Sequence, residues 1–359
     1  MAGSPMSLTP EVTEATLRPS GLRPAALIAG LAAVAIAVTA GLTIGPAGIP
    51  VHRAVLELFD TLPGLTFDSG LSSAHAAIVR EIRLPRVVLG LLVGATLSMS
   101  GATYQAAFRN PLADPYLLGI AAGAGLGATI AITNSLGDGA GALDPVPLAA
   151  FAGGLIAVAV SYVAGHLGGR STASLILAGI AVASFLTACQ TYVLQANSDA
   201  FRKIFAWILG RIATSGWSEP ALMLPYFVLT TAVVLRYRRA LDVLAVGDEE
   251  AAALGIEPRK VRLIVVLAAS LGAAAAVSVS GLIGFVGIIV PHTVRLAFGA
   301  SNRVVLPLSV LFGGAFMVLA DLGARTVLSP SELPIGVVTA FLGAPFFVLV
   351  LRTTRREVW

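Results

Sequence analysis

Five hydroxyl and amide side chains follow one face of an apolar segment that begins near residue 173. Ser184, Thr187, Thr191, Gln195 and Ser198 are separated by three, four, four and three residues. This spacing places them on one side of an α-helix. In hydrocarbon such a polar stripe must face protein or water. It therefore predicts either the lining of a path through a membrane or a helix–helix contact that uses hydroxyls as hydrogen-bonding groups.

Residues that would couple transport to an ion gradient, or catalyse a reaction, are scarce. Asp321 is the exception within the apolar segments, and Arg325 follows it by four residues, where the two can pair. No GxxxxGK[ST] phosphate loop occurs, because Lys203 and Lys260 each follow an arginine. The four histidines are scattered and lack metal-ligand spacing. The sequence predicts no catalytic residue, no metal site and an energy source outside this chain.

The elements that position these residues are predicted membrane spans. The chain has 359 residues, of which 57% are hydrophobic and only 12% charged, against roughly 25% charged in soluble domains. The 22 uncharged residues between Arg86 and Arg109 would form a helix about 33 Å long, enough to cross a hydrocarbon core of about 30 Å. We predict an all-α polytopic membrane protein with about ten transmembrane helices, at residues 25–45, 87–108, 116–133, 146–165, 173–196, 218–235, 262–280, 282–298, 304–323 and 334–351.

This arrangement predicts one membrane domain over residues 25–352, with a disordered tail at 1–24 and a short tail at 353–359. The first apolar run is longer than the 7–15 residues of a signal-peptide core, which favours an uncleaved span. If both termini are cytoplasmic, 15 of the 23 Lys and Arg residues fall on the cytoplasmic side, as the positive-inside rule expects. Three of the outer eight, Arg80, Arg83 and Arg86, crowd the start of the second span and need a further reason.

Two halves of the chain show a faint repeat at an offset of 180 residues. Ser98, Ser100 and Gly101 match Ser278, Ser280 and Gly281 in spans predicted to run in opposite directions. This indicates an inverted repeat that relates helices 2–5 to helices 7–10. Glycines at 119, 123 and 127 share one helical face and predict close helix packing. Residues 51–59 predict an amphipathic helix on the membrane surface.

Several long motifs occur in a fixed order along the chain. They read IRLPR (82–86), SGATYQAAFRNPLADPYLLG (100–119), LAG (177–179), ALGIEP (253–258), SGLIGFVGIIVPHTVRL (280–296) and ELPIGVVTAFLGAPFF (332–347). From about residue 78 to 352 the chain resembles the FecCD-type permeases of ABC importers, the family of the vitamin B12, haem and ferric-siderophore permeases.

The resemblance implies a BtuC-like fold and a set of partners. The expected partners are a second permease copy, two ATPase subunits, an extracytoplasmic substrate-binding protein and membrane lipid, but no nucleic acid. A heterodimer with a related permease stays open. The chain itself would bind no cofactor, since ATP and magnesium belong to the ATPase. The implied location is the bacterial inner (plasma) membrane, with a ferric siderophore as the first expected cargo and haem or cobalamin as the others.

The resemblance also assigns roles to residues of this chain. The outer arginines Arg83, Arg86 and Arg325 would pair with acidic residues of the binding protein, with lipid headgroups as the alternative. Thr172 falls at the cytoplasmic gate, and Ser198 at the outer end of the path. The cytoplasmic loop at about 240–260 would hold the coupling helix for the ATPase, with Asp248, Glu249, Glu250, Leu254, Gly255 and Ile256. An ion-coupled secondary transporter and a polytopic membrane enzyme are the competing interpretations.

Overall fold

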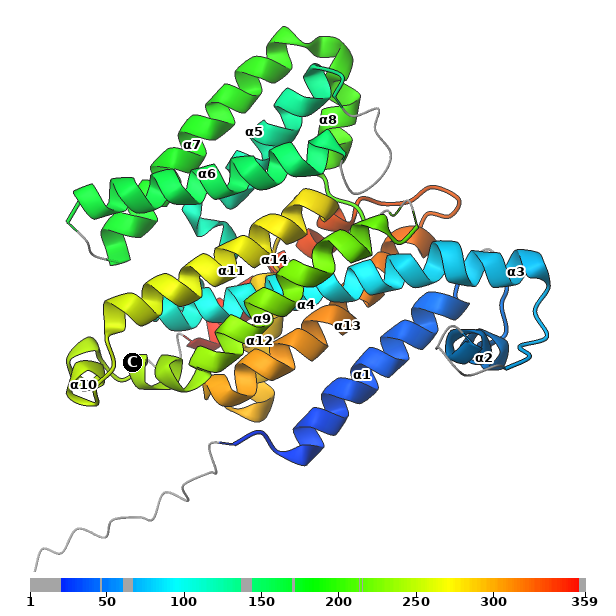
Figure 1. Ribbon diagram of the computed structural model, residues 1–359, viewed down its shortest axis with the longest axis horizontal. Coiled ribbons are helices and arrows are strands. Elements are labelled where there is room, and N and C mark those ends of the chain that lie inside the picture. The colour runs from blue at the N-terminus through cyan, green and yellow to red at the C-terminus, as the bar shows by residue number, and fades with distance from the viewer. Residues whose placement is uncertain are drawn as a thin grey trace, which may run out of the picture.

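A computed structural model shows the protein as a bundle of helices (Figure 1). The structure describes residues 21–45, 47–60, 67–136, 144–169, 172–212, 214 and 216–354, with side chains as far as residue 350. No β-strand occurs in those ranges. Most of the predicted N-terminal tail and of the C-terminal tail lies outside the described residues.

Seven of the described helices are long and apolar enough to cross a membrane. They are α1 (Pro24–Thr43), α4 (Leu84–Phe108), α6 (Pro145–Leu167), α7 (Thr172–Ala196), α9 (Ser218–Leu244), α11 (Pro258–Ser280) and α13 (Asn302–Thr326). Three shorter apolar helices, α5 (Ile120–Thr133), α12 (Val286–Phe298) and α14 (Ile335–Thr354), match the other three predicted spans. The predicted fold class is confirmed.

Shorter helices connect the spans. They are α2 (Val51–Asp60), α3 (Ser73–Ala77), which continues through a π-helical turn into α4, α8 (Phe201–Ile208) and α10 (Asp248–Ala253). Helix α2 coincides with the predicted amphipathic segment. Proline stands in the first turn of α1, α4, α6 and α11, where its missing N–H has no helical partner to lose.

Helix α4 forms the centre of the bundle, and 89% of its apolar window is buried. A Cβ atom added to Gly94 would lie 2.2 Å from the Gly313 carbonyl oxygen of α13, and one added to Gly101 would lie 2.0 Å from the Gly287 carbonyl oxygen of α12. Glycine is required at these positions because the two backbones touch.

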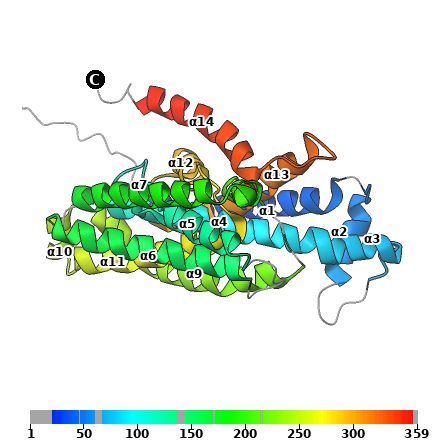
Figure 2. The ribbon, with the colours of Figure 1, turned by 90° about the horizontal axis from the view of Figure 1, so that it is seen from above.

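Helices α5, α6 and α7 form a group on one side of this centre (Figure 1). The predicted glycine face packs them together, since a Cβ on Gly123 would lie 2.2 Å from the Gly153 oxygen of α6. Only 6% of the apolar window of α7 is buried within the chain. Helix α14 also projects away from the bundle (Figure 2). These two helices leave wide apolar surfaces uncovered by the rest of the described chain.

The predicted start of the eighth span is wrong by four residues. The eighth span was expected from residue 282, but residues 281–285 are not helical and α12 begins at Val286. Gly281 and Phe285 both have positive φ angles, of 69° and 70°. Non-helical backbone at membrane depth needs hydrogen-bond partners. Tyr116 supplies one, since its hydroxyl donates to the Ile283 carbonyl oxygen at 2.9 Å.

Candidate translocation and coupling sites

The polar stripe of α7 lies on the exposed side of the helix. Ser184, Thr187 and Thr191 line one shallow groove together with Asp114 and Tyr116. The hydroxyls of Ser184 and Thr191 donate to carbonyl oxygens one turn earlier on α7, each at 2.9 Å. Their hydrogen bonds therefore stay within α7. This geometry favours the lining of a path over a contact between helices of this chain.

Asp114 lines this groove, although the sequence patterns did not single it out. It caps the 3-10 turn Pro115–Leu118, and its Oδ1 accepts from the Tyr116 N–H at 2.8 Å. This turn reaches into the bundle, because a Cβ on Gly179 would lie 2.1 Å from the Leu117 carbonyl oxygen. Gly179 is seven residues, or about 10 Å, beyond the start of α7. The turn between α4 and α5 thus places a carboxylate beside the stripe and at depth.

The C-terminal end of the stripe extends beyond the last residue of α7. Gln195 is exposed near the end of the helix, and Ser198 begins a separate 3-10 turn, Ser198–Ala200. Both residues are exposed, but neither lines the groove of Ser184 and Thr191.

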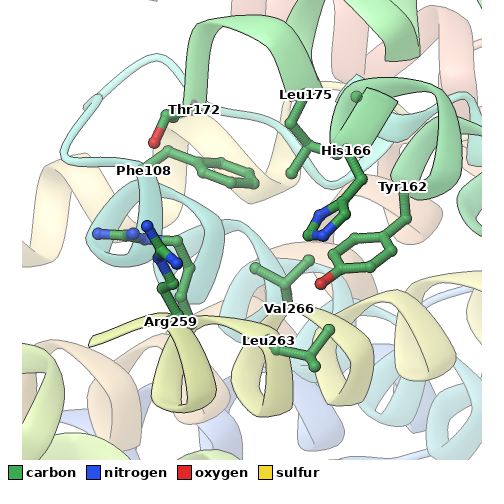
Figure 3. Close-up of a pocket in the computed structure, with 10 residues that line it drawn as sticks. Phe108, Tyr162, His166, Thr172, Leu175, Arg259, Leu263 and Val266 are labelled. Carbon is green, nitrogen blue, oxygen red and sulfur yellow. The ribbon is translucent and has the colours of Figure 1, made fainter. Parts of the chain in front are cut away.

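Thr172, the predicted gate, does not share the stripe. It lies at the start of α7, 12 residues or about 18 Å before Ser184. Thr172 instead lines a cavity between α6, α7, α11 and the end of α4, with Phe108, His166 and Arg259 nearby (Figure 3). The structure therefore brings Ser184, Thr187 and Thr191 together, and it places Thr172 at a different site.

Two of the outer arginines bond to the end of α1. Arg83 is 5% exposed, and it donates to the carbonyl oxygens of Leu42, Thr43 and Ala47 at 2.6, 3.1 and 2.8 Å. Arg325 donates to the Gly41 carbonyl oxygen at 2.6 Å. The last carbonyls of a helix lack helical partners and carry partial negative charge. Both guanidinium groups satisfy these carbonyls.

Arg86 joins α4 to α13 and to the segment before α14. It donates to both carboxylate oxygens of Asp321, with Nε–Oδ2 and Nη2–Oδ1 distances of 2.9 Å. It also donates to both oxygens of Glu332, each at 2.9 Å. The predicted Asp321–Arg325 pair is present at 3.9 Å. The hydrogen bonds from Arg86 lower the pKa of the Glu332 carboxyl below its usual value.

These contacts give Arg83 and Arg86 a role inside the chain that the sequence did not predict, and they add a bond to α1 to the predicted pair of Arg325. Their side chains hold α1, α4 and α13 together at one end of the bundle. Glu332 is the most exposed member of the group, with 53% of its side chain accessible. Docking of a binding protein by the three arginines stays a prediction. A carboxylate of the binding protein would have to compete for these guanidinium groups with the carbonyl and carboxylate oxygens that already bind them.

The predicted coupling helix is present as α10. Asp248, Glu249 and Glu250 occupy its first turn, and Gly255 follows it with a φ of 79°. Leu254 caps the helix and is 70% exposed, and Ile256 is partly buried. This arrangement presents an apolar tip and an acidic turn on one short helix.

Asp248 ties this helix to the rest of the bundle. It forms ion pairs with Arg109, at the end of α4, and with Arg262 of α11, whose Nη2 lies 3.0 Å from Oδ1. Arg262 also donates from Nε to the Ala107 carbonyl oxygen at 2.9 Å. The ends of α4 and α11 are therefore joined to α10 through one carboxylate.

The model of the FecCD transport family matches residues 33–353. The chain belongs to this family. It is 41% identical, over 95% of its length and 90% of the relative's, to the cobalamin import system permease BtuC of Halobacterium salinarum. It is 39% identical to the hemin transport system permease HmuU of Yersinia pestis, over 77% of this chain and 84% of that relative.

Two further comparisons agree with this assignment. The chain is 38% identical to the ABC transporter permease YvrB of Bacillus subtilis, over 92% of this chain and 94% of the relative. It also superposes on a metal-chelate type ABC transporter solved in an inward-facing conformation, with a TM-score of 0.80 and 28% identity over 92% of this chain and all of that one. The chain is a multi-pass membrane permease of this family, as its motifs indicated.

Proposed function

We propose that this chain is the membrane permease of an ATP-driven importer that takes up a metal chelate. The observation that carries the proposal is the hydroxyl-lined groove of α7, which lies open on a permease of the FecCD family. Hydroxyl and carboxylate groups in such a groove suit a polar chelate that passes through without tight binding. The chain would supply the path, and a partner would supply the energy.

The proposed cargo is a class of compounds. Relatives of the chain are named for cobalamin, hemin and ferric citrate, each a metal held by organic ligands. A ferric siderophore, the cargo expected from the sequence, belongs to the same class. The similarity to the cobalamin permease over 95% of this chain supports testing cobalamin together with the siderophore.

The proposed assembly contains two permease copies, two ATPase subunits and an extracytoplasmic binding protein. The open surfaces of α7 and α14 support a second copy, because apolar surface without a partner inside the chain is typical of an interface. The exposed Leu254 and acidic first turn of α10 support a docking contact with an ATPase, which would bind ATP and magnesium. Both termini would lie in the cytoplasm, and the membrane would be the bacterial plasma membrane.

In the proposed mechanism, ATP binding moves α10, and the bonds of Asp248 pass this movement to α4 and α11. The paired α7 helices then change the side on which the path is open. The contacts of Asp321 argue against it as the ion-binding group of an ion-coupled transporter, because Arg86 and Arg325 already neutralise this buried carboxylate. An ion-binding group should exchange its partner during transport.

Uptake into vesicles that contain the permease and its ATPase tests the proposal. Labelled cobalamin, a ferric siderophore and hemin would each be supplied on the cognate binding protein, with and without ATP. We expect ATP-dependent uptake of one of them without any ion gradient. Replacing Thr187 and Thr191 by valine should reduce uptake at least severalfold, because both hydroxyls leave the groove. The control, Thr39→Val on α1, changes the same group away from the groove.

Uptake that follows a proton or sodium gradient and persists without the ATPase would refute the proposal. Equal uptake by the groove variant and the α1 control would leave the importer intact but would remove the groove as its path.

A further inference from the structure

A half-enclosed cavity separates the predicted gate from the coupling segment. Four helices, α4, α6, α7 and α11, line it, with apolar walls and a polar rim (Figure 3). The apolar side chains are Phe108 of α4, Leu175 of α7, and Leu263 and Val266 of α11, and the polar ones are Tyr162, His166, Thr172, Arg259 and Arg262. None of these residues lines the groove of Ser184 and Thr191. The cavity is therefore separate from the proposed path.

The rim carries one arginine that has no ion-pair partner within the described residues. Arg262 is already bound to Asp248 and to a carbonyl oxygen of α4. Arg259 is exposed, and its guanidinium forms no hydrogen bond or ion pair within the described ranges. Pro258 begins α11 beside it, so the positive end of the helix dipole adds to the charge of Arg259. An anionic group is the ligand that this rim would attract.

The size of the cavity excludes the cargo as its ligand. It holds about 120 Å³, whereas pockets that enclose drug-sized molecules hold about 300–1,000 Å³. Residues next to the lining in the sequence add exposed apolar surface outside the cavity. Leu167 of α6 is 85% exposed and Leu267 of α11 is 48% exposed. A small anionic head with apolar chains outside the cavity fits both features.

We propose that the cavity binds the phosphate group of an anionic phospholipid from the cytoplasmic leaflet. Arg259 pairs with the phosphate, and the hydroxyls of Thr172 and Tyr162 donate to its oxygens. The acyl chains follow the apolar surfaces of α6 and α11. Basic pockets between membrane helices on the cytoplasmic side are suited to such headgroups. A bound phosphate would connect the first turn of α7 with the start of α11, directly after α10.

Native mass spectrometry of the purified full-length protein tests this site. The protein would be placed in micelles with equal amounts of phosphatidylglycerol and phosphatidylcholine, and retained lipids would be counted. We expect selective retention of phosphatidylglycerol, lowered about tenfold by Arg259→Gln, because a hydrogen-bonded charge pair is lost. The control, Arg239→Gln, removes the same charge from an exposed position on α9 and should leave retention within about twofold of the original.

A second variant, Leu263→Trp, fills the cavity while keeping every charge, and it should also reduce retention. Equal losses in the Arg259 and Arg239 variants would overturn the site in favour of general surface attraction. Unchanged retention in both cavity variants would overturn it as well. Displacement of the lipid by millimolar inorganic phosphate would show that free phosphate, and not a headgroup, is the ligand. The test needs no cargo or ATPase, so it is independent of the proposed function.

Discussion

Replacing Arg86 by methionine should destabilise the protein far more than replacing Glu332 by glutamine, although Arg86 and Glu332 are hydrogen-bonded to each other. The difference follows from where the two carboxylates lie. The side chain of Asp321 is 7% exposed and that of Glu332 is 53% exposed. The variant strands the first carboxylate inside the bundle, with Arg325 at 3.9 Å as its remaining ion-pair partner.

Breaking a buried ion pair by removing one partner costs about 3–5 kcal/mol, because the other charge is left without compensation. An exposed pair contributes about 0–1 kcal/mol. We therefore expect Arg86→Met to lower the free energy of unfolding by about 3–5 kcal/mol and Glu332→Gln by less than about 1 kcal/mol. Adding Asp321→Asn to the Arg86 variant should recover part of the loss, because the stranded charge disappears.

The unfolding free energy would be measured by titrating SDS into mixed micelles and following helix content by circular dichroism. The Arg239→Met variant controls for removal of an exposed arginine. The reasoning is refuted if the Arg86 variant is no less stable than the Glu332 variant. It is also refuted if Asp321→Asn lowers the free energy of unfolding equally in the original protein and in the Arg86→Met variant, since the two substitutions would then act independently.

Three other outcomes follow from the same structure. Gly94→Ala should lower the free energy of unfolding by about 1–3 kcal/mol, because the added Cβ meets the α13 backbone. Gly284→Ala should lower it less, because nothing lies within 4 Å of the added Cβ, and equal losses in the two variants would contradict this packing. The lowered pKa of Glu332 means that its pairing stabilises the protein above the ordinary carboxyl pKa and is lost as pH falls through the lowered value. Glu332→Gln should remove this part of the loss of stability in acid, and an unchanged pH profile of the unfolding free energy would contradict it. Asp248→Asn should speed amide hydrogen exchange in α10 severalfold, because it weakens two ion pairs. Glu249→Gln should leave the exchange rate unchanged, and equal rates in the two variants would contradict the role of Asp248 in holding α10 to α4 and α11.

The sequence predicted the membrane helices well because their signal is local. A long uncharged run has few alternatives to a membrane helix, and every predicted span has a described helix at its position. The break at residues 281–285 was missed for the same reason. This segment is apolar, so hydropathy does not distinguish it from the helix that follows. Its course depends on Tyr116, which lies more than 160 residues earlier in the chain.

The site residues were harder to predict, because their roles depend on distant contacts. The spacing of Ser184, Thr187 and Thr191 was sufficient to predict one face of α7. The family resemblance alone placed Thr172 at the gate. Nothing near Arg83 in the sequence indicated that the last carbonyls of α1 would surround it. Asp114 lies in a turn, so a search of the helical faces did not find it.

The contacts at the two ends of α4 indicate how this permease would transmit movement. At one end, Arg86 fixes α4 to α13 and to the segment before α14. At the other end, Arg262 and Asp248 fix it to α11 and α10. Between these ends the helix is buried and packed backbone to backbone through Gly94 and Gly101. Such a helix resists bending, because tightly packed cores transmit strain. Helix α7 packs on α5 and α6, but only 6% of its apolar window is buried within the described chain. We therefore expect α4 and its neighbours to move as one body when α10 is displaced, and α7 to change its position relative to that body.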